Sequence, residues 1–60
     1  MNKSISIIGA GESGIGAAIL AKKNSYNVFV SDNNIIKTNY RKVLIENRID
    51  FEEGGHSFEK

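Results

Sequence analysis

The chain has 60 residues, no cysteine and a formal net charge of +1, from eight basic and seven acidic side chains. The lack of cysteine excludes disulfides and thiolate metal sites and agrees with a reducing, cytoplasmic location. The balanced charge provides no basic surface for nucleic acid or an anionic membrane, and no apolar stretch is long enough to span a bilayer. We therefore expect a soluble cytoplasmic chain without nucleic-acid or membrane partners.

The first predicted element is a short buried strand, Ser4–Ile8, which leads into a glycine-rich turn. Gly9, Gly11 and Gly14 form the pattern Gly-x-Gly-x-x-Gly, and an apolar helix over 15–24 follows. In such a unit the first glycine allows a tight turn, the second lets an anion approach the backbone, and the third lets the helix pack against the strand. The helix start then offers unpaired N–H groups to a phosphate. The pattern predicts a phosphate cradle, and the alternative is a tight turn without a ligand.

A second strand is predicted over Asn27–Ser31, and Asp32 follows it directly. In nucleotide-binding units of this kind, an acid about 20 residues past the glycines, at the carboxyl end of the second strand, contacts a ribose or a base. We interpret Asp32 as the acceptor for ribose hydroxyls or a base N–H group. The alternative is an ordinary turn aspartate whose carboxylate caps Asn34.

Two further elements follow. An apolar stripe at helical spacing predicts a second helix, and its members are Ile36, Tyr40, Val43 and Leu44. A third short strand, Ile49–Glu53, alternates in polarity as a sheet edge does, and Gly54-Gly55 ends it. The order β-α-β-α-β predicts an α/β fold, the Rossmann-like start of a parallel sheet, incomplete.

The apolar run Val28–Val30 is typical of a strand covered on both faces. Three strands and two helices would not cover both faces of the sheet. The apolar strand residues that need to be buried are Ile7, Val28, Val30 and Phe51. We therefore expect residues 1–60 to be the N-terminal part of a larger domain. So short a chain is marginal in stability, and one alternative is that it does not fold or bind a ligand by itself.

The remaining polar residues give weaker signals. Ser13 either donates to a phosphate or caps the helix, and Glu12 is expected to point sideways or to contact a sugar or base, because its charge is unfavourable beside a diphosphate. A lone histidine such as His56 is more often solvated or helix-capping than functional. We expect five cationic side chains to form solvated helix faces: Lys22, Lys23, Lys37, Arg41 and Lys42. Tyr40 and Phe51 fit core packing. The sequence contains no P-loop, nucleophile–base pair or metal-ligand spacing, so we predict no catalytic and no metal-binding residue.

The glycine turn, the tract over 17–23, the strand that ends in Asp32 and the segment Phe51–His56 together resemble one family. They are similar to the amino-terminus of the UDP-N-acetylmuramoyl-L-alanine:D-glutamate ligases of the Mur ligase family, and the likeness covers essentially the whole chain. The resemblance implies an ATP-dependent, amide-bond-forming enzyme of peptidoglycan precursor synthesis. In that family the first domain holds the UDP of the substrate, the second binds ATP and Mg²⁺, and the third binds D-glutamate.

The resemblance also implies a binding site. Its glycine loop contacts the diphosphate, which places Gly11, Glu12, Ser13 and Gly14 there, and the acid after the second strand reads the uracil, which places Asp32 there. Asn33-Asn34 stand where many members have Thr-Arg or similar residues, so the resemblance does not carry those contacts over. The ATP, Mg²⁺ and D-glutamate sites would lie outside these 60 residues, and the fragment alone is expected to be inactive.

The residues themselves leave a second interpretation open. The same glycine spacing fits a dinucleotide-binding module, either in an NAD-dependent oxidoreductase or in a nucleotide-sensing regulatory domain. Asp32 would then bind the adenosine ribose and favour NAD over NADP. The two interpretations differ in the ligand that they predict, which is a UDP-linked sugar for the ligase and NAD for the dinucleotide-binding module.

Overall fold

A computed structural model describes residues 3–56, and it has the predicted element order. The elements are β1 (Ser4–Ile8), α1 (Glu12–Lys23), β2 (Asn27–Ser31), α2 (Thr38–Glu46) and β3 (Asp50–Glu52). The strands form one parallel sheet in the order β1-β2-β3, so β3 is an edge strand, as its alternating polarity indicates. The predicted fold class, an incomplete Rossmann-like α/β start, is confirmed.

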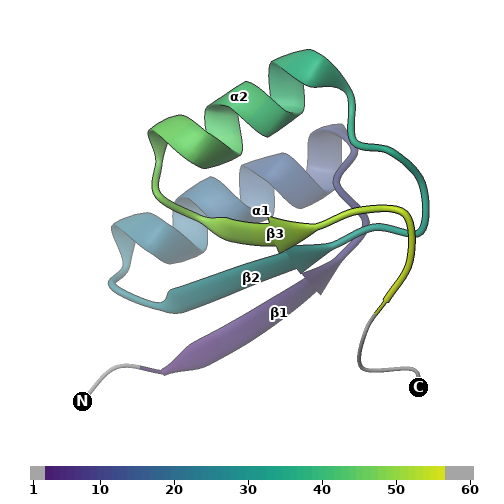
Figure 1. Ribbon diagram of the computed structural model, residues 1–60. Coiled ribbons are helices and arrows are strands. Elements are labelled where there is room, and N and C mark those ends of the chain that lie inside the picture. The colour runs from purple at the N-terminus through teal and green to yellow at the C-terminus, as the bar shows by residue number, and fades with distance from the viewer. Residues whose placement is uncertain (1–2, 57–60) are drawn as a thin grey trace.

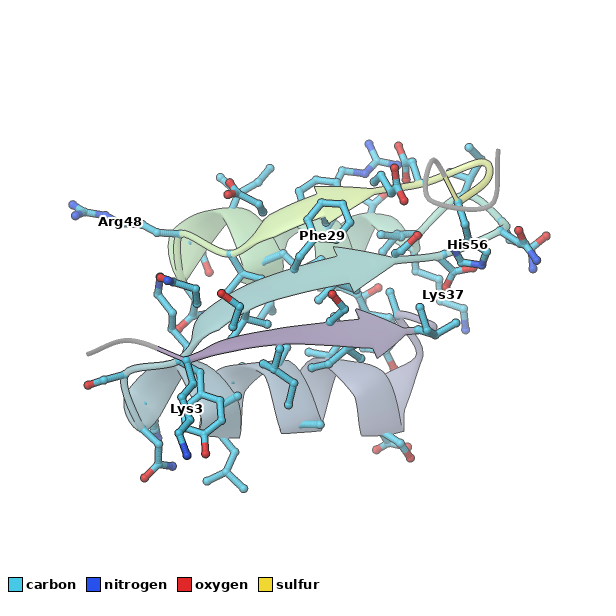
Figure 2. The ribbon with its side chains drawn as sticks, turned by 90° about the horizontal axis from the view of Figure 1, so that it is seen from below. Lys3, Phe29, Lys37, Arg48 and His56 are labelled. Carbon is cyan, nitrogen blue, oxygen red and sulfur yellow. The ribbon has the colours of Figure 1, made fainter. Side chains whose placement is uncertain are left out.

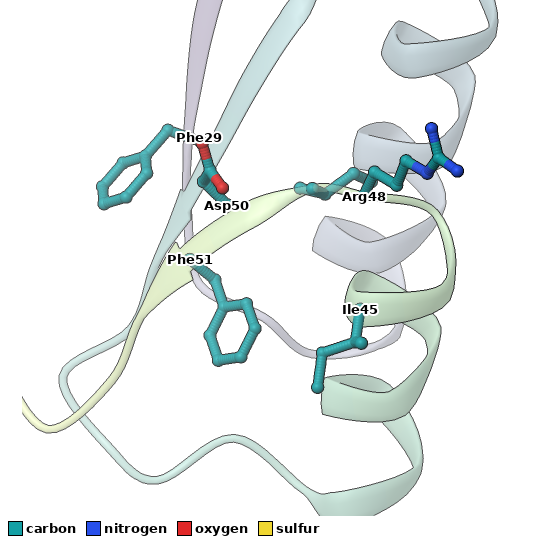
Figure 3. A pocket seen from close by; sticks show the side chains of 6 residues that line it. Phe29, Ile45, Arg48, Asp50 and Phe51 are labelled. Carbon is teal, nitrogen blue, oxygen red and sulfur yellow. The ribbon is translucent and has the colours of Figure 1, made fainter.

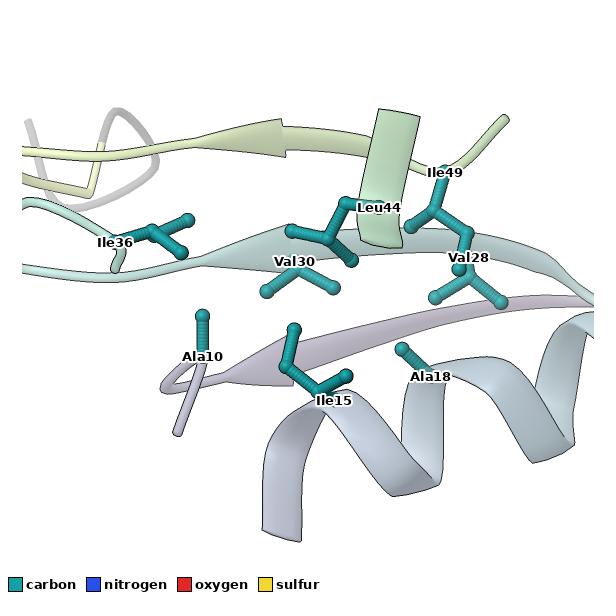
Figure 4. Packing of buried hydrophobic residues seen from close by; sticks show 8 residues of the cluster. All are labelled: Ala10, Ile15, Ala18, Val28, Val30, Ile36, Leu44 and Ile49. Carbon is teal, nitrogen blue, oxygen red and sulfur yellow. The ribbon is translucent and has the colours of Figure 1, made fainter. Parts of the chain in front are cut away.

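Both helices cover the same face of the sheet (Figure 1). Register pairs Ile7 with Val30 and Val30 with Phe51, so these side chains lie side by side on that face. Val28 lies on it too, two residues before Val30. The buried cluster against the helices is shown in Figure 4 and consists of Ala10, Ile15, Ala18, Val28, Val30, Ile36, Leu44 and Ile49.

Within the described residues, the two helices cover one face of β2. Strand alternation turns Phe29 to the opposite face, beside Ser6 and Asp50, where it is only half-buried (Figure 2). The four apolar strand residues named above therefore share one face, where Val28 and Val30 are buried and Ile7 and Phe51 are half-buried. No helix of residues 3–56 lies on the face of Phe29, so cover on both faces of β2 stays a prediction about the larger domain.

Two glycines fix the entry into α1. Gly9 has a φ of +97°, a backbone conformation that L side chains rarely adopt. A Cβ at Gly14 would lie 2.0 Å from the carbonyl oxygen of Gly9, so only glycine lets the helix start pack this closely on the turn. The predicted tight turn and close helix–strand packing are both present. Together they hold the start of α1 at the carboxyl end of β1.

The element boundaries differ from the prediction at α1, α2 and β3. α2 begins at Thr38, so Ile36 precedes the helix, although it was counted in the helix's apolar stripe. α1 begins at Glu12, within the glycine motif, because its first turn follows Gly11 directly. β3 is shorter than predicted, since Ile49 precedes the strand and is buried in the core instead. Within residues 3–56, no helix is long and apolar enough to cross a membrane.

Candidate functional site

Three loops meet at the carboxyl edge of the sheet, because parallel strands all end there (Figure 1). The loop after β1 and the loop after β2 enclose a cleft of about 520 Å³. The first loop and the start of α1 supply part of its lining, namely Ala10, Gly11 and Glu12. The second loop and the start of α2 supply the rest, namely Asp32, Asn34, Ile35, Ile36, Lys37 and Tyr40.

Asp32 joins the two sides of this cleft. Its Oδ2 accepts the N–H of Ala10 at 2.7 Å, and its Oδ1 accepts the N–H of Asn34 at 2.9 Å. Two hydrogen bonds lower the pKa of the Asp32 carboxyl below its usual value, first that from Ala10 and then that from Asn34. The charge of His56 lowers this pKa to a smaller extent. The turn-capping role considered for Asp32 is therefore present. Each carboxylate oxygen can still accept a second hydrogen bond, so the group remains an acceptor for a ligand.

The start of α1 presents donors to the cleft. Gly11 is the N-cap with an extended backbone, and no side chain caps the helix there. The first intrahelical bond in this turn runs from the N–H of Ile15 to the carbonyl of Gly11, at 2.9 Å. The preceding N–H groups, those of Glu12, Ser13 and Gly14, belong to the first turn, which lacks intrahelical acceptors. Ser13 is thus inside the helix, and its interpretation as the N-cap is wrong.

Two residues on the other side of the cleft were missed by the sequence reasoning. Lys37 was assigned to a solvated helix face and Tyr40 to the core. Lys37 is the N-cap of α2 and lines the cleft, whereas the half-buried Tyr40 both packs against the core and lines the cleft. The sequence did contain a signal for both residues, because a helix that follows a parallel strand starts at the same edge of the sheet as the glycine loop.

The loop after β3 holds the loop after β2 in place. The N–H of Gly54 donates to the carbonyl of Asn34 and that of Gly55 to the carbonyl of Asp32, both at 3.2 Å. Glu53 Oε1 accepts the N–H of Ile36 at 2.9 Å and lies 3.5 Å from the Arg41 guanidinium. Arg41 is therefore a half-buried tether and not the solvated side chain that we expected.

His56 is buried, which corrects its interpretation as solvated or helix-capping. Its Nδ1 is hydrogen-bonded to the hydroxyl of the fully buried Ser31, and that hydroxyl donates to Glu52 Oε2 at 2.7 Å. A serine hydroxyl has one proton, so with Glu52 as its acceptor the imidazole must donate from Nδ1. The network fastens the third loop to the end of β2, directly beside Asp32.

A larger cavity, of about 650 Å³, lies beside β3 and is lined by Phe29, Ile45, Arg48, Ile49, Asp50 and Phe51 (Figure 3). It touches neither the glycine loop nor Asp32, and the backbone N–H groups of a helix start do not reach it. We therefore place the candidate site in the smaller cleft, where fixed donors and an ionised acceptor converge. No group of three or more metal-ligating side chains occurs within residues 3–56.

The cleft brings together two kinds of polar group. N–H groups at a helix start suit a phosphate, and an ionised carboxylate held by two backbone bonds suits the N–H of a base or the hydroxyls of a ribose. With the parallel β-α-β-α-β arrangement, these features define the incomplete start of a Rossmann-like domain. The sequence matches the family described as the MurD N-terminal domain over residues 4–59, and the chain belongs to that family.

Similar curated proteins share one name, UDP-N-acetylmuramoylalanine–D-glutamate ligase. The protein of that name from Christiangramia forsetii is 53% identical over 60 residues, which is 100% of this chain and 14% of that protein. The Bacteroides thetaiotaomicron protein is 51% identical over 57 residues, 95% of this chain and 13% of its own length. The Cytophaga hutchinsonii protein is 47% identical over 60 residues, 100% of this chain and 13% of its own length. The chain thus spans about one seventh of these relatives, and no solved structure gave a match.

Proposed function

We propose that this chain is the UDP-holding start of an ATP-dependent cytoplasmic ligase. The enzyme would add D-glutamate to UDP-N-acetylmuramoyl-L-alanine in peptidoglycan precursor synthesis. Membership of the MurD N-terminal domain family and the shared name of the relatives support the reaction. The observation that carries the binding role is the cleft in which the start of α1 faces the Asp32 carboxylate.

In this proposal the diphosphate lies against the start of α1. Gly11, Glu12, Ser13 and Gly14 contact it, chiefly through backbone N–H groups that have no acceptor in the helix. A Cβ built on Gly11 meets no heavy atom within 4 Å, so the space beside this residue is open to a ligand.

Asp32 accepts the N–H of the uracil in the same arrangement. Its carboxyl has a pKa below the usual value because two backbone N–H groups bind the charged form, so it is an ionised acceptor at neutral pH. The two backbone bonds hold its orientation before any ligand binds, which reduces the entropy lost on binding.

The sites for ATP, Mg²⁺ and D-glutamate would lie outside these 60 residues, because the sequence contains no P-loop and the described residues contain no metal-ligand group. We therefore expect residues 1–60 alone to hold the nucleotide and not to catalyse ligation.

A chimera tests the proposal. The chain replaces the matched segment of the Christiangramia forsetii ligase, with which it shares 53% identity, and ligation is measured with and without Asp32→Ala. We expect an active chimera in which Asp32→Ala weakens binding of the UDP-linked substrate by about 1–3 kcal/mol, or about 5–150-fold, because a polar partner in the cleft is lost. Asp50→Ala, on β3 outside the cleft, is the matched control and should leave binding unchanged. An unchanged affinity in Asp32→Ala would remove Asp32 from the site.

The NAD-binding module remains the second candidate, since a carboxylate at the end of β2 also fits a ribose. It predicts tighter binding of NAD than of UDP by the same cleft. The family match favours the ligase.

A further inference from the structure

One cationic side chain of the cleft has no role in the site described so far. Lys37 lines the cavity that also contains Glu12 and Asp32, and its side chain is exposed. Among residues 3–56 its ammonium group has no hydrogen-bond or ion-pair partner, whereas Lys22 donates to the carbonyl of Arg48 at 3.2 Å.

The requirements of α2 do not explain a lysine at this position. Lys37 is the N-cap of the helix, its side chain makes no capping bond, and the first turn contains no acidic residue to offset its charge. A helix start carries partial positive charge, so a cation there is unfavourable, whereas Lys22 and Lys23 in the last turn of α1 are favourably placed. Residues that break a local rule without a structural gain are concentrated at functional sites.

The charges on the two sides of the cleft give a reason for a lysine at position 37. Glu12 stands in the first turn of α1, where a phosphate would lie, and its carboxylate would repel that phosphate. Asp32 accepts the N–H groups of Ala10 and Asn34, and within residues 3–56 no ion pair joins it to Lys37. Lys37 is the only cation that lines this cleft within the described chain, and Figure 2 shows it at the same end of the sheet as His56.

We propose that Lys37 is a phosphate-contacting residue that offsets Glu12 and makes the cleft select a nucleoside diphosphate over the nucleoside alone. This inference rests on the proposed function for the cleft itself and adds the residue that recognises the phosphate charge. An ammonium–phosphate contact is charge-assisted, so its loss weakens binding more than the loss of a neutral hydrogen bond.

The test compares UDP and uridine on the 60-residue chain, with binding measured by calorimetry and folding checked by circular dichroism. In Lys37→Gln we expect the affinity for UDP to fall about tenfold and that for uridine to stay unchanged. Lys37→Arg keeps the charge and should retain the preference for UDP. Lys42→Gln, a matched change at an exposed lysine of the same helix outside the cleft, should have no effect.

An unchanged UDP affinity in Lys37→Gln, or an equal loss for UDP and uridine, would overturn the inference. So would a wild-type chain that binds UDP no better than uridine. The same binding measurements with ADP and adenosine separate failure of the Lys37 inference from failure of the proposed function. If the wild type prefers ADP to UDP, the uridine-specific proposal fails, and the role of Lys37 is then decided by its effect on the ratio of ADP to adenosine binding.

Discussion

The strongest structural prediction compares Gly14 with Gly16, two glycines of α1 that lie two residues apart. A Cβ at Gly14 would lie 2.0 Å from the Gly9 carbonyl oxygen, whereas real Cβ atoms essentially never approach closer than 3.0 Å. Gly14→Ala must therefore separate helix and turn by about 1 Å, and backbone atoms cannot rotate away as a flexible side chain can. We expect a loss of about 3 kcal/mol, the upper part of the overpacking range.

That loss is large for this chain. At about 0.05–0.15 kcal/mol per residue, a chain of this size has an unfolding free energy of only about 3–9 kcal/mol. Gly14→Ala should consequently unfold a large fraction of the molecules or lower the urea midpoint steeply.

Gly16→Ala is the matched control. No heavy atom lies within 4 Å of a Cβ at this exposed helical position, so alanine should stabilise the chain by about 0.5–1 kcal/mol through its helix propensity. Urea unfolding followed by circular dichroism at the helix band measures both variants. Equal stability of Gly14→Ala and wild type, or shifts of the same sign in the two variants, would refute the packing described here.

Three further changes test the loops around the cleft. Glu53→Ala removes the acceptor for a backbone N–H and the ion pair with Arg41, so we expect a loss of about 1–2 kcal/mol in urea unfolding. Ser31→Ala removes a fully buried hydroxyl that bonds two side chains and should cost about 1–3 kcal/mol by the same measurement. The folded-state pKa of Asp32 is lowered, so its stabilisation is complete above the unfolded pKa and is lost as pH falls through the folded value. Asp32→Asn should therefore flatten the pH dependence of stability on the acid side, and an unaltered curve would count against the two backbone bonds.

Local patterns were sufficient to predict the element order and the glycine turn. Gly9 and Gly14 stand where a positive φ and a close backbone approach require them, and Asp32 lies where the end of a second parallel strand brings it to the turn. These features depend on short-range geometry and on one general rule of parallel sheets.

What the sequence did not reveal depends on tertiary contacts. The burial of His56 requires Ser31 as its partner, and these residues lie 25 positions apart. The pairing of Arg41 with Glu53 and the place of Lys37 in the cleft likewise depend on how α2 is oriented on the sheet. Periodicity identifies the apolar face of a helix and leaves the partners of its polar residues undetermined.

The most direct test of the central claim is a titration of the isotope-labelled chain with UDP and with NAD, followed by amide NMR. The proposed function predicts saturable shifts at Gly11, Glu12, Ser13 and Asn34, with UDP binding more tightly than NAD. Tighter binding of NAD, or shifts confined to the cavity beside β3 around Phe29, would contradict it.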